Sequence, residues 1–293
     1  MYFKVLKLNY ATFLFLFVIL FSSIFLYNFV FASADSLENN VIKLPIIMYH
    51  SVLKDPARSG KYIITPSTLE SDLKYIAEKG YHTITMTELI HYVYNKTPLP
   101  ENPIILTFDD GYYNNLTYVL PLLEKYDMKA VVSIVGAYTN TYTKSDEANA
   151  NYSYLRWKDI QALMDTGRFE FQNHTYNLHS EKNGRKGASK KKGETQEQYA
   201  SILSQDIGRL QQDFKEATGY LPNTFTYPFG LMSKDSKEII QSLGFKASLS
   251  CAEGINSIQI GDYNCLYYLK RYNRSSFIST DKFFQKIFKA MKK

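Results

Sequence analysis

Cysteine is scarce in this chain of 293 residues, which has only Cys251 and Cys265. Neither belongs to a C-x-x-C pair or has a histidine nearby, so both are poor metal ligands. Outside the cell they could form one disulfide, and two unpaired buried thiols are the equal alternative.

A strong excess of one charge is also lacking. The formal charge of +6 falls to +4 without residues 1–34, which hold two lysines and no acids. A balance this mild, without a basic stripe on any expected helix, argues against a nucleic-acid partner.

The long apolar run of this sequence lies at the amino terminus. Lys4 and Lys7 precede 22 uncharged residues, 10–31, and a small-x-small sequence follows at 32–34. Such a run is long enough to span a bilayer, and the small residues are typical of a signal-peptidase site. We therefore expect residues 1–34 to be either a cleaved signal peptide or an anchor that holds the protein to the membrane through residues 10–31. Residues 35–293 are then one exported domain and a monomer, either secreted or attached to the outer face of a bacterial cytoplasmic membrane.

Strand and helix patterns alternate along the rest of the chain, which predicts a parallel sheet. The expected strands are 44–49, 83–85, 104–108, 130–135, 169–173, 224–227, 247–249 and 266–269. The expected helices are 66–79, 87–94, 116–126, 157–166, 196–218, 234–243 and 280–291. Seven or eight strands in this order favour a closed or nearly closed barrel over an open sheet.

Two segments interrupt the alternation. Residues 138–154 are polar and are expected to form a long loop. Residues 181–194 are basic and glycine-containing, which predicts a mobile, solvated surface loop; contact with an anionic wall polymer or with phospholipid headgroups is the alternative. The chain also has 25 tyrosines, and tyrosine-rich surfaces suit sugar rings, although packing in the core accounts for most of them.

Two adjacent carboxylates end one of the expected buried strands. Asp109 and Asp110 follow an apolar run and precede Gly111. Parallel strands deliver residues to the sheet edge where α/β folds place their sites. Two neighbouring anions disfavour each other, and a metal ion bound by one of them relieves the conflict. The pair could instead cap the next helix, and the strand end alone leaves the two interpretations equal.

Two of the five histidines supply the partners that a metal site needs. His174 and His179 lie where another expected strand turns into a loop, and their spacing does not suit one face of a helix. One aspartate and two imidazoles form a three-ligand set for zinc or a similar divalent ion, with a position left for water. A third strand ends in the turn Tyr227-Pro-Phe-Gly, where the backbone N–H of Phe229 could face an oxyanion. Together these elements favour the catalytic interpretation of the aspartates.

The three elements resemble, in this order, motifs of the polysaccharide deacetylases of carbohydrate esterase family 4, the NodB homology domain. The motifs are Thr-Phe-Asp-Asp-Gly at 107–111, His-Thr-x-x-x-His at 174–179 and Tyr-Pro-Phe-Gly at 227–230. The resemblance covers the chain from about residue 44 onward. The opening at 44–51 and the histidine spacing look most like the branch that deacetylates poly-β-1,6-N-acetylglucosamine.

The resemblance implies a distorted (β/α) barrel of about seven parallel strands. It also implies a metal-dependent hydrolase that removes N-acetyl groups from N-acetylglucosamine units of an extracellular or cell-wall polysaccharide. By position it makes Asp109 the general base. It makes Asp110, His174 and His179 the ligands of a divalent cation, for which zinc is the expected ion.

The sequence departs from the family pattern at two places. Thr226 stands where the family usually has an arginine that orients the catalytic aspartate, and Leu269-Lys-Arg271 replaces the usual Leu-x-His. Arginine does not donate a proton usefully at neutral pH, but its charge could steady an aspartate or an oxyanion. We expect Tyr227 and Arg271 to contact substrate. We expect His50, at the end of the first strand, to replace the missing histidine as the acid.

Three alternative functions are an O-acetyl esterase, a glycan-binding protein and a glycosidase. An esterase that removes O-acetyl groups is the close alternative, because the same chemistry attacks an ester more easily. A glycan-binding protein on the deacetylase scaffold is favoured by the missing arginine and histidine. A glycosidase fits poorly, because adjacent carboxylates do not flank a bond at the ~5–9 Å separations that this chemistry uses.

Overall fold

The structure is a computed structural model that describes residues 15, 18–20, 22–23, 41–182 and 184–292. It divides into two units, Met1–Val41 and Ile42–Lys293. The expected signal peptide or anchor lies almost wholly outside the described residues, and those described within it are helical. Over the described part of the chain, no helix combines the length and apolar character needed to cross a membrane.

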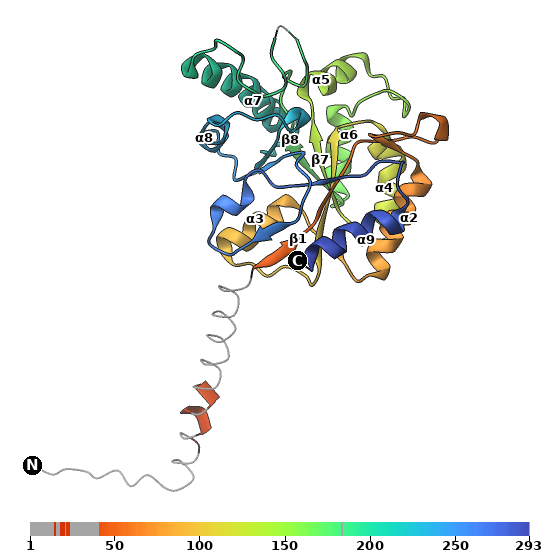
Figure 1. The fold of residues 1–293 in the computed structure, drawn as a ribbon, viewed down its shortest axis with the longest axis vertical. Coiled ribbons are helices and arrows are strands. Elements are labelled where there is room, and N and C mark those ends of the chain that lie inside the picture. The colour runs from red at the N-terminus through yellow and green to blue at the C-terminus, as the bar shows by residue number, and fades with distance from the viewer. Residues whose placement is uncertain (1–14, 16–17, 21, 24–40, 183, 293) are drawn as a thin grey trace, which may run out of the picture. The chain divides into compact units, whose positions relative to one another are not determined.

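The second unit is built on one parallel sheet with the strand order β10-β9-β8-β7-β6-β2-β12, and β5 pairs with the start of β6. Figure 1 shows two of its central strands, β7 and β8, next to each other. The strands are β2 (Ile46–Tyr49), β5 (His82–Thr83), β6 (Pro103–Asp110), β7 (Ala130–Ile134), β8 (Phe169–Asn173), β9 (Thr224–Thr226), β10 (Ala247–Leu249) and β12 (Tyr272–Asn273). Leu269 also forms a bridge with Leu249 of β10, while Tyr272 pairs with Ile47 of β2. The segment 269–273 therefore links the two edges of the sheet, and the expected distorted (β/α) barrel is confirmed.

Helices surround this sheet, which explains why its strands are apolar on both faces. They are α2 (Pro66–Glu78), α3 (Met86–Asn95), α4 (Leu120–Lys125), α5 (Gly136–Ser145), α6 (Trp157–Asp165), α7 (Gln196–Thr218), α8 (Ser236–Ser242) and α9 (Thr280–Met291). Local signals set their ends. Thr195 caps α7 by accepting a hydrogen bond from the N–H of Gln198, and Gly219 ends α7 in a left-handed conformation.

Two short pairs of strands lie outside the main sheet: β1 (Ile42–Leu44) with β11 (Asn256–Ile258), and β3 (Ser51–Val52) with β4 (Ile63–Ile64).

The register of the sheet brings the chemically important strand ends together. Asp110 on β6 pairs with Ile134, Ile134 also pairs with Asn173, and Asn173 pairs with Phe225 on β9. Because all these strands are parallel, their carboxyl ends meet at one edge. The aspartates of β6 and residues 174–179 after β8, called the histidine segment, therefore share that edge, as the sequence predicts.

Two expected elements differ in the structure. The expected strand 266–269 is wrong, because a 3-10 turn occupies Tyr263–Leu266 and Tyr268 adopts a positive φ of 59°. The expected long loop at 138–154 is wrong in its first half, where α5 follows β7 directly. This helix has no apolar stripe to reveal it. It fits because Gly136 lacks a Cβ, which would lie 2.7 Å from the Tyr176 ring and 2.9 Å from Leu210.

The basic segment 181–194 forms no helix or strand at its described positions, as expected. It is attached to the body rather than hanging free of it. The N–H of Lys190 donates to Ser233 Oγ at 2.7 Å, and the Tyr199 hydroxyl donates to the carbonyl oxygen of Ala188 at 2.8 Å. Within the segment, Arg185 forms an ion pair with Glu194. Cys251 and Cys265 are both free thiols in the structure, as the second alternative expected. The expectation that they are buried is wrong, because Cys251 is exposed and Cys265 is partly exposed.

Candidate active site

A cavity of about 410 Å³ opens at the carboxyl edge of the sheet. The four residues expected to form the catalytic and metal site, Asp109, Asp110, His174 and His179, all line it. They come from β6 and from the segment after β8. The residues that the sequence assigns to chemistry are therefore brought together by the fold.

The side chains of Asp110, His174 and His179 converge on one point. The Nε2 atoms of His174 and His179 lie 3.7 and 3.3 Å from Oδ1 of Asp110. That Oδ1 is buried and accepts no hydrogen bond within the described structure. A buried acceptor without a partner is costly, and a cation between these atoms would satisfy it. Within the described residues, this trio is the one cluster whose ligand atoms, all within 4.8 Å of one another, could hold a metal ion.

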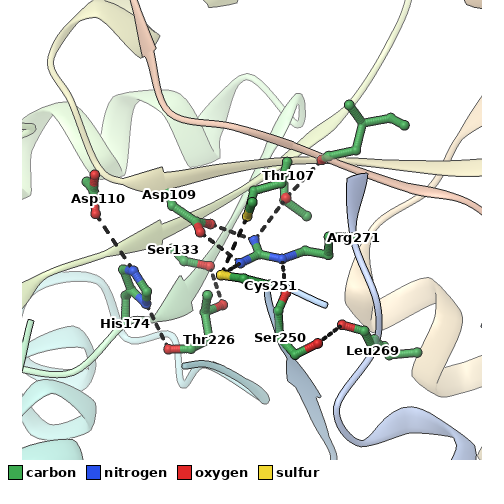
Figure 2. A network of polar contacts seen from close by, with 12 residues as sticks. Thr107, Asp109, Asp110, Ser133, His174, Thr226, Ser250, Cys251, Leu269 and Arg271 are labelled. Carbon is green, nitrogen blue, oxygen red and sulfur yellow. Dashed lines mark hydrogen bonds and ion pairs between the residues drawn. The ribbon is translucent and has the colours of Figure 1, made fainter. Parts of the chain in front are cut away.

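Both imidazoles are prepared to act as ligands. Burial lowers the pKa of His174 to about 3 and also lowers the pKa of His179, so both rings are neutral at physiological pH. The N–H at Nδ1 of His174 donates a hydrogen bond to the carbonyl oxygen of Thr226 at 2.7 Å. The unprotonated Nε2 is then directed at Asp110 (Figure 2). Burial raises the pKa of Asp110 to about 6, and a bound cation would counter this shift. Neutral nitrogens and a carboxylate oxygen suit a divalent ion.

The end of β6 has a constrained backbone that aims the carboxylates into the cavity. Asp110 and Gly111 both adopt positive φ angles, of 74° and 76°. A Cβ on Gly111 would lie 2.8 Å from Cγ2 of Ile134, so glycine alone fits beside β7. The Asp-Asp-Gly sequence is therefore required by geometry as well as by chemistry.

Asp109 is held by a buried arginine. Nη1 and Nη2 of Arg271 donate to its two carboxylate oxygens at 2.7 and 2.8 Å (Figure 2). Arg271 also donates to Thr107 Oγ1 at 3.1 Å and to the carbonyl oxygen of Ser250 at 2.8 Å. Burial alone would raise the pKa of Asp109, but the charge and hydrogen bonds of Arg271 keep it well below its usual range. Asp109 is thus an oriented anion in the cavity wall.

This ion pair answers one of the departures noted in the sequence. Thr226 instead hydrogen-bonds Ser133 through its hydroxyl at 2.7 Å. The guanidinium that the family usually supplies at that position comes here from the segment before β12. Arg271 itself is fully buried and does not line the cavity, so the expected contact with substrate is wrong. Its fork is already occupied by Asp109.

Two further expectations concern the third strand end. The side chain of Tyr227 is wholly buried and its hydroxyl lies 2.9 Å from Ser236 Oγ, so it cannot contact a ligand in the cavity as expected. Phe229 does line the cavity, with a positive φ of 58°. Its ring lies 4.5 Å from the ring of His179, and 43% of its surface remains exposed. Phe229 is thus part of the rim.

His50 lies on the wall of the same cavity, as its place at the end of the first strand predicts. Its ring packs on Tyr62 with centroids 4.7 Å apart, and its buried Nδ1 has no partner in the described part of the chain. Burial lowers the pKa of His50, while Asp109 and Asp110 oppose that shift.

Sequence reasoning missed the residues that hold the histidine segment in place. On α7, Oδ1 of Asp206 accepts the N–H of Tyr176 at 2.7 Å and Oδ2 accepts the N–H of Asn177 at 2.9 Å. No local pattern marks Asp206, because it is one acid among several on a polar helix. Tyr112 and Cys251 also line the cavity; the first directly follows the Asp-Asp-Gly sequence and could have been found by that adjacency.

Comparison with known proteins agrees with this geometry. The sequence model of the family described as polysaccharide deacetylase matches residues 96–248, just over half of the chain. The poly-β-1,6-N-acetyl-D-glucosamine N-deacetylase of Escherichia coli K12 is 22% identical over 227 residues, which are 71% of this chain and 34% of that protein. The enzyme of the same name from Staphylococcus aureus MSSA476 is 25% identical over 202 residues, 69% of this chain and 66% of that protein. The chain therefore spans about a third of the first relative and slightly under two thirds of the second.

A solved structure shows the same fold. The Streptococcus pyogenes deacetylase PplD in complex with acetate superposes with a TM-score of 0.67 at 20% identity, over 85% of this chain and 99% of that one. The shared fold extends well beyond the residues matched by the family model.

Proposed function

The chain belongs to the polysaccharide deacetylase family, and on that premise we propose that it removes N-acetyl groups from N-acetylglucosamine units of an extracellular or cell-wall polysaccharide. One observation carries the proposal. The anionic carboxylate of Asp109, which Arg271 holds, lies next to the cluster of Asp110 and two neutral histidines, and Oδ1 of Asp110 has no hydrogen-bond partner among the described residues. The names of the relatives support a β-1,6-linked polymer as the substrate, and they support the export that residues 1–34 predict.

Asp110, His174 and His179 are the residues that would hold a divalent cation, and zinc is the ion that two imidazoles and one carboxylate favour. When bound, such an ion lowers the pKa of water and polarises a carbonyl. The other residues then have separate roles. Asp109 takes a proton from the attacking water, and Arg271 keeps it ionised and oriented for that task. The backbone N–H of Phe229 stabilises the oxyanion.

Hydrolysis ends when the bond between the acetyl carbon and the nitrogen breaks. The nitrogen leaves as an amine and needs a proton, while the acetyl group leaves as acetate. We assign this proton to His50, which lies on the cavity wall and has a ring nitrogen without a partner among the described residues. Burial disfavours its protonated form, and the negative charges of Asp109 and Asp110 favour it. In this proposal His50 acts as the acid and Asp109 as the base, and both line the same cavity.

The structure also bears on the glycan-binding alternative, which the absence of the usual arginine favoured. Arg271 supplies a guanidinium to Asp109 from another segment, so the base is oriented as catalysis requires. This observation supports an enzyme over an inactive scaffold.

Acetate release by metal-loaded protein on β-1,6-linked, β-1,4-linked and peptidoglycan substrates tests the proposal. We expect turnover on the β-1,6-linked polymer, and loss of it in Asp109→Asn. Asp213→Asn is the matched control, because Asp213 lies on α7 and bonds Asn140 at 2.8 Å, outside the cavity. Full activity in Asp109→Asn would refute the mechanism. Release from O-acetylated substrates alone would assign an esterase instead.

A further inference from the structure

The basic segment 181–194 and the histidine segment together form a hollow that the proposed chemistry does not use. It has a volume of about 370 Å³ and its wall includes Lys182, Arg185 and Lys191. Leu178 and Ser180, the two neighbours of His179, also line it. His179 itself faces the catalytic cavity. The hollow and the cavity are therefore adjacent, with one segment of chain between them.

The charge of this molecule is concentrated at the hollow. Residues 181–194 hold six cationic side chains and two glutamates, a net charge of +4. Residues 35–293 as a whole also carry +4, because the two lysines before residue 35 account for the rest of the +6. The rest of residues 35–293 is thus neutral overall. The net positive charge of the domain therefore lies in segment 181–194, beside the active site.

Two of the cations are available to a ligand. Arg185 is paired with Glu194 and donates to the carbonyl oxygen of Ser189, so its charge is largely neutralised. Lys182 and Lys191 are exposed, and neither ammonium has a carboxylate partner among the described residues. Two ammonium groups on the wall of one hollow favour an anionic group.

The remainder of the hollow suits a sugar ring. Leu178 and Ile202 give it an apolar surface, and 40% of Ile202 is exposed. A second hollow of about 380 Å³ shares Leu178 and Ile202 and continues along α7. There the guanidinium of Arg209 stacks 3.7 Å above the ring of Tyr176. The two hollows adjoin through Leu178 and Ile202, and together they are called the groove.

We propose that this groove binds an acidic sugar of the substrate glycan, with its carboxylate or phosphate on Lys182 and Lys191. The inference rests on the proposed function. It adds that, among acetylated glycans that contain N-acetylglucosamine, those with acidic substituents near the acetamido group bind more tightly than a neutral β-1,6-linked homopolymer, which uses the catalytic cavity alone. A glycan is favoured over a lipid headgroup because the groove adjoins the catalytic cavity through His179 and its neighbours. One glycan chain can therefore contact the cavity and the groove together.

The test compares binding of one oligosaccharide in two forms. A tetrasaccharide of alternating N-acetylglucosamine and N-acetylmuramic acid is used with its carboxylates free or methyl-esterified, and calorimetry measures its binding to metal-free protein. We expect the free acid to bind roughly three- to tenfold more tightly than the ester, with the difference shrinking in high salt. The variant Lys182→Ala/Lys191→Ala should abolish the difference. Lys282→Ala/Lys289→Ala removes equal charge from α9, which lies away from α7 (Figure 1), and should preserve it.

Three results would overturn the inference. The acid and the ester could bind equally to the wild-type protein, or the difference could persist in Lys182→Ala/Lys191→Ala. The same variant could also lose binding to phosphatidylglycerol vesicles while it retains the preference for the acid, which would assign the lysines to a membrane surface. Binding is measured without turnover. Failure of acetate release on every substrate would therefore refute the proposed function and leave this test unaffected.

Discussion

Replacement of Arg271 by leucine should destabilise the protein strongly and impair catalysis at the same time. The side chains of Arg271 and Asp109 are almost fully buried, and two hydrogen bonds of 2.7 and 2.8 Å join them. Arg271→Leu removes the positive charge and leaves the carboxylate buried without compensation. It also takes a hydrogen bond from the carbonyl oxygen of Ser250.

The expected magnitude follows from the cost of an unpaired buried charge. Removing one partner of a buried ion pair costs about 3–5 kcal/mol in the free energy of unfolding. For a domain of this size, that lowers the midpoint of urea unfolding by about 1–2 M. The double variant Arg271→Leu/Asp109→Asn has no buried charge at either position and should recover most of the loss.

A second buried pair provides the matched control. Nε of Arg274 donates to Asp72 at 2.7 Å, and both side chains are as buried as those of the catalytic pair. Arg274→Leu should therefore cost similar stability. Only Arg271→Leu should also lower kcat, by roughly 10²-fold, because Asp109 loses its orientation. Urea unfolding and acetate release, measured under conditions where each variant is folded, separate the two effects. An unchanged urea midpoint in Arg271→Leu, or an equal loss of kcat in Arg274→Leu, would refute this reasoning.

Three further predictions follow from the site. Zinc at about 100 times its dissociation constant should stabilise the fold by about 2.7 kcal/mol and raise the melting temperature, measured by calorimetry, by about 5–10 °C. The same zinc concentration should change the melting temperature of Asp110→Asn little. Asp206→Ala should weaken zinc binding by roughly tenfold in a chelator competition, because two backbone N–H groups of the histidine segment lose their acceptor, and Asp213→Ala should not. Gly230→Ala should lower the melting temperature and the activity together, because residue 230 has a φ of 66° and its new Cβ would lie 2.8 Å from the backbone nitrogen of Cys251. A variant with the melting temperature and activity of the wild type would contradict this expected clash.

Local patterns in the sequence predict much of the fold. The strands at 104–108 and 169–173 and the helix at 196–218 lie where expected, because period, caps and glycines encode them within a few residues. The helix α5 is absent from the prediction because its stability comes from packing against Tyr176 and Leu210, which follow it in the chain. A sequence without an apolar stripe does not reveal contacts of this kind.

The sequence by itself determined the reacting groups of this protein. Adjacent aspartates at a strand end and two histidines at another are local features, and both proved to line one cavity. The sequence left open whether the charge of Arg271 serves an aspartate or an oxyanion. Only the tertiary structure decided that it holds Asp109, because the two residues are 162 positions apart in the chain. The tertiary structure also decided the role of Tyr227. Its place in the motif predicts contact with substrate, but its side chain is buried in the core. Residue type and spacing specify which chemistry is available, whereas burial and long-range pairing decide which side chains can perform it.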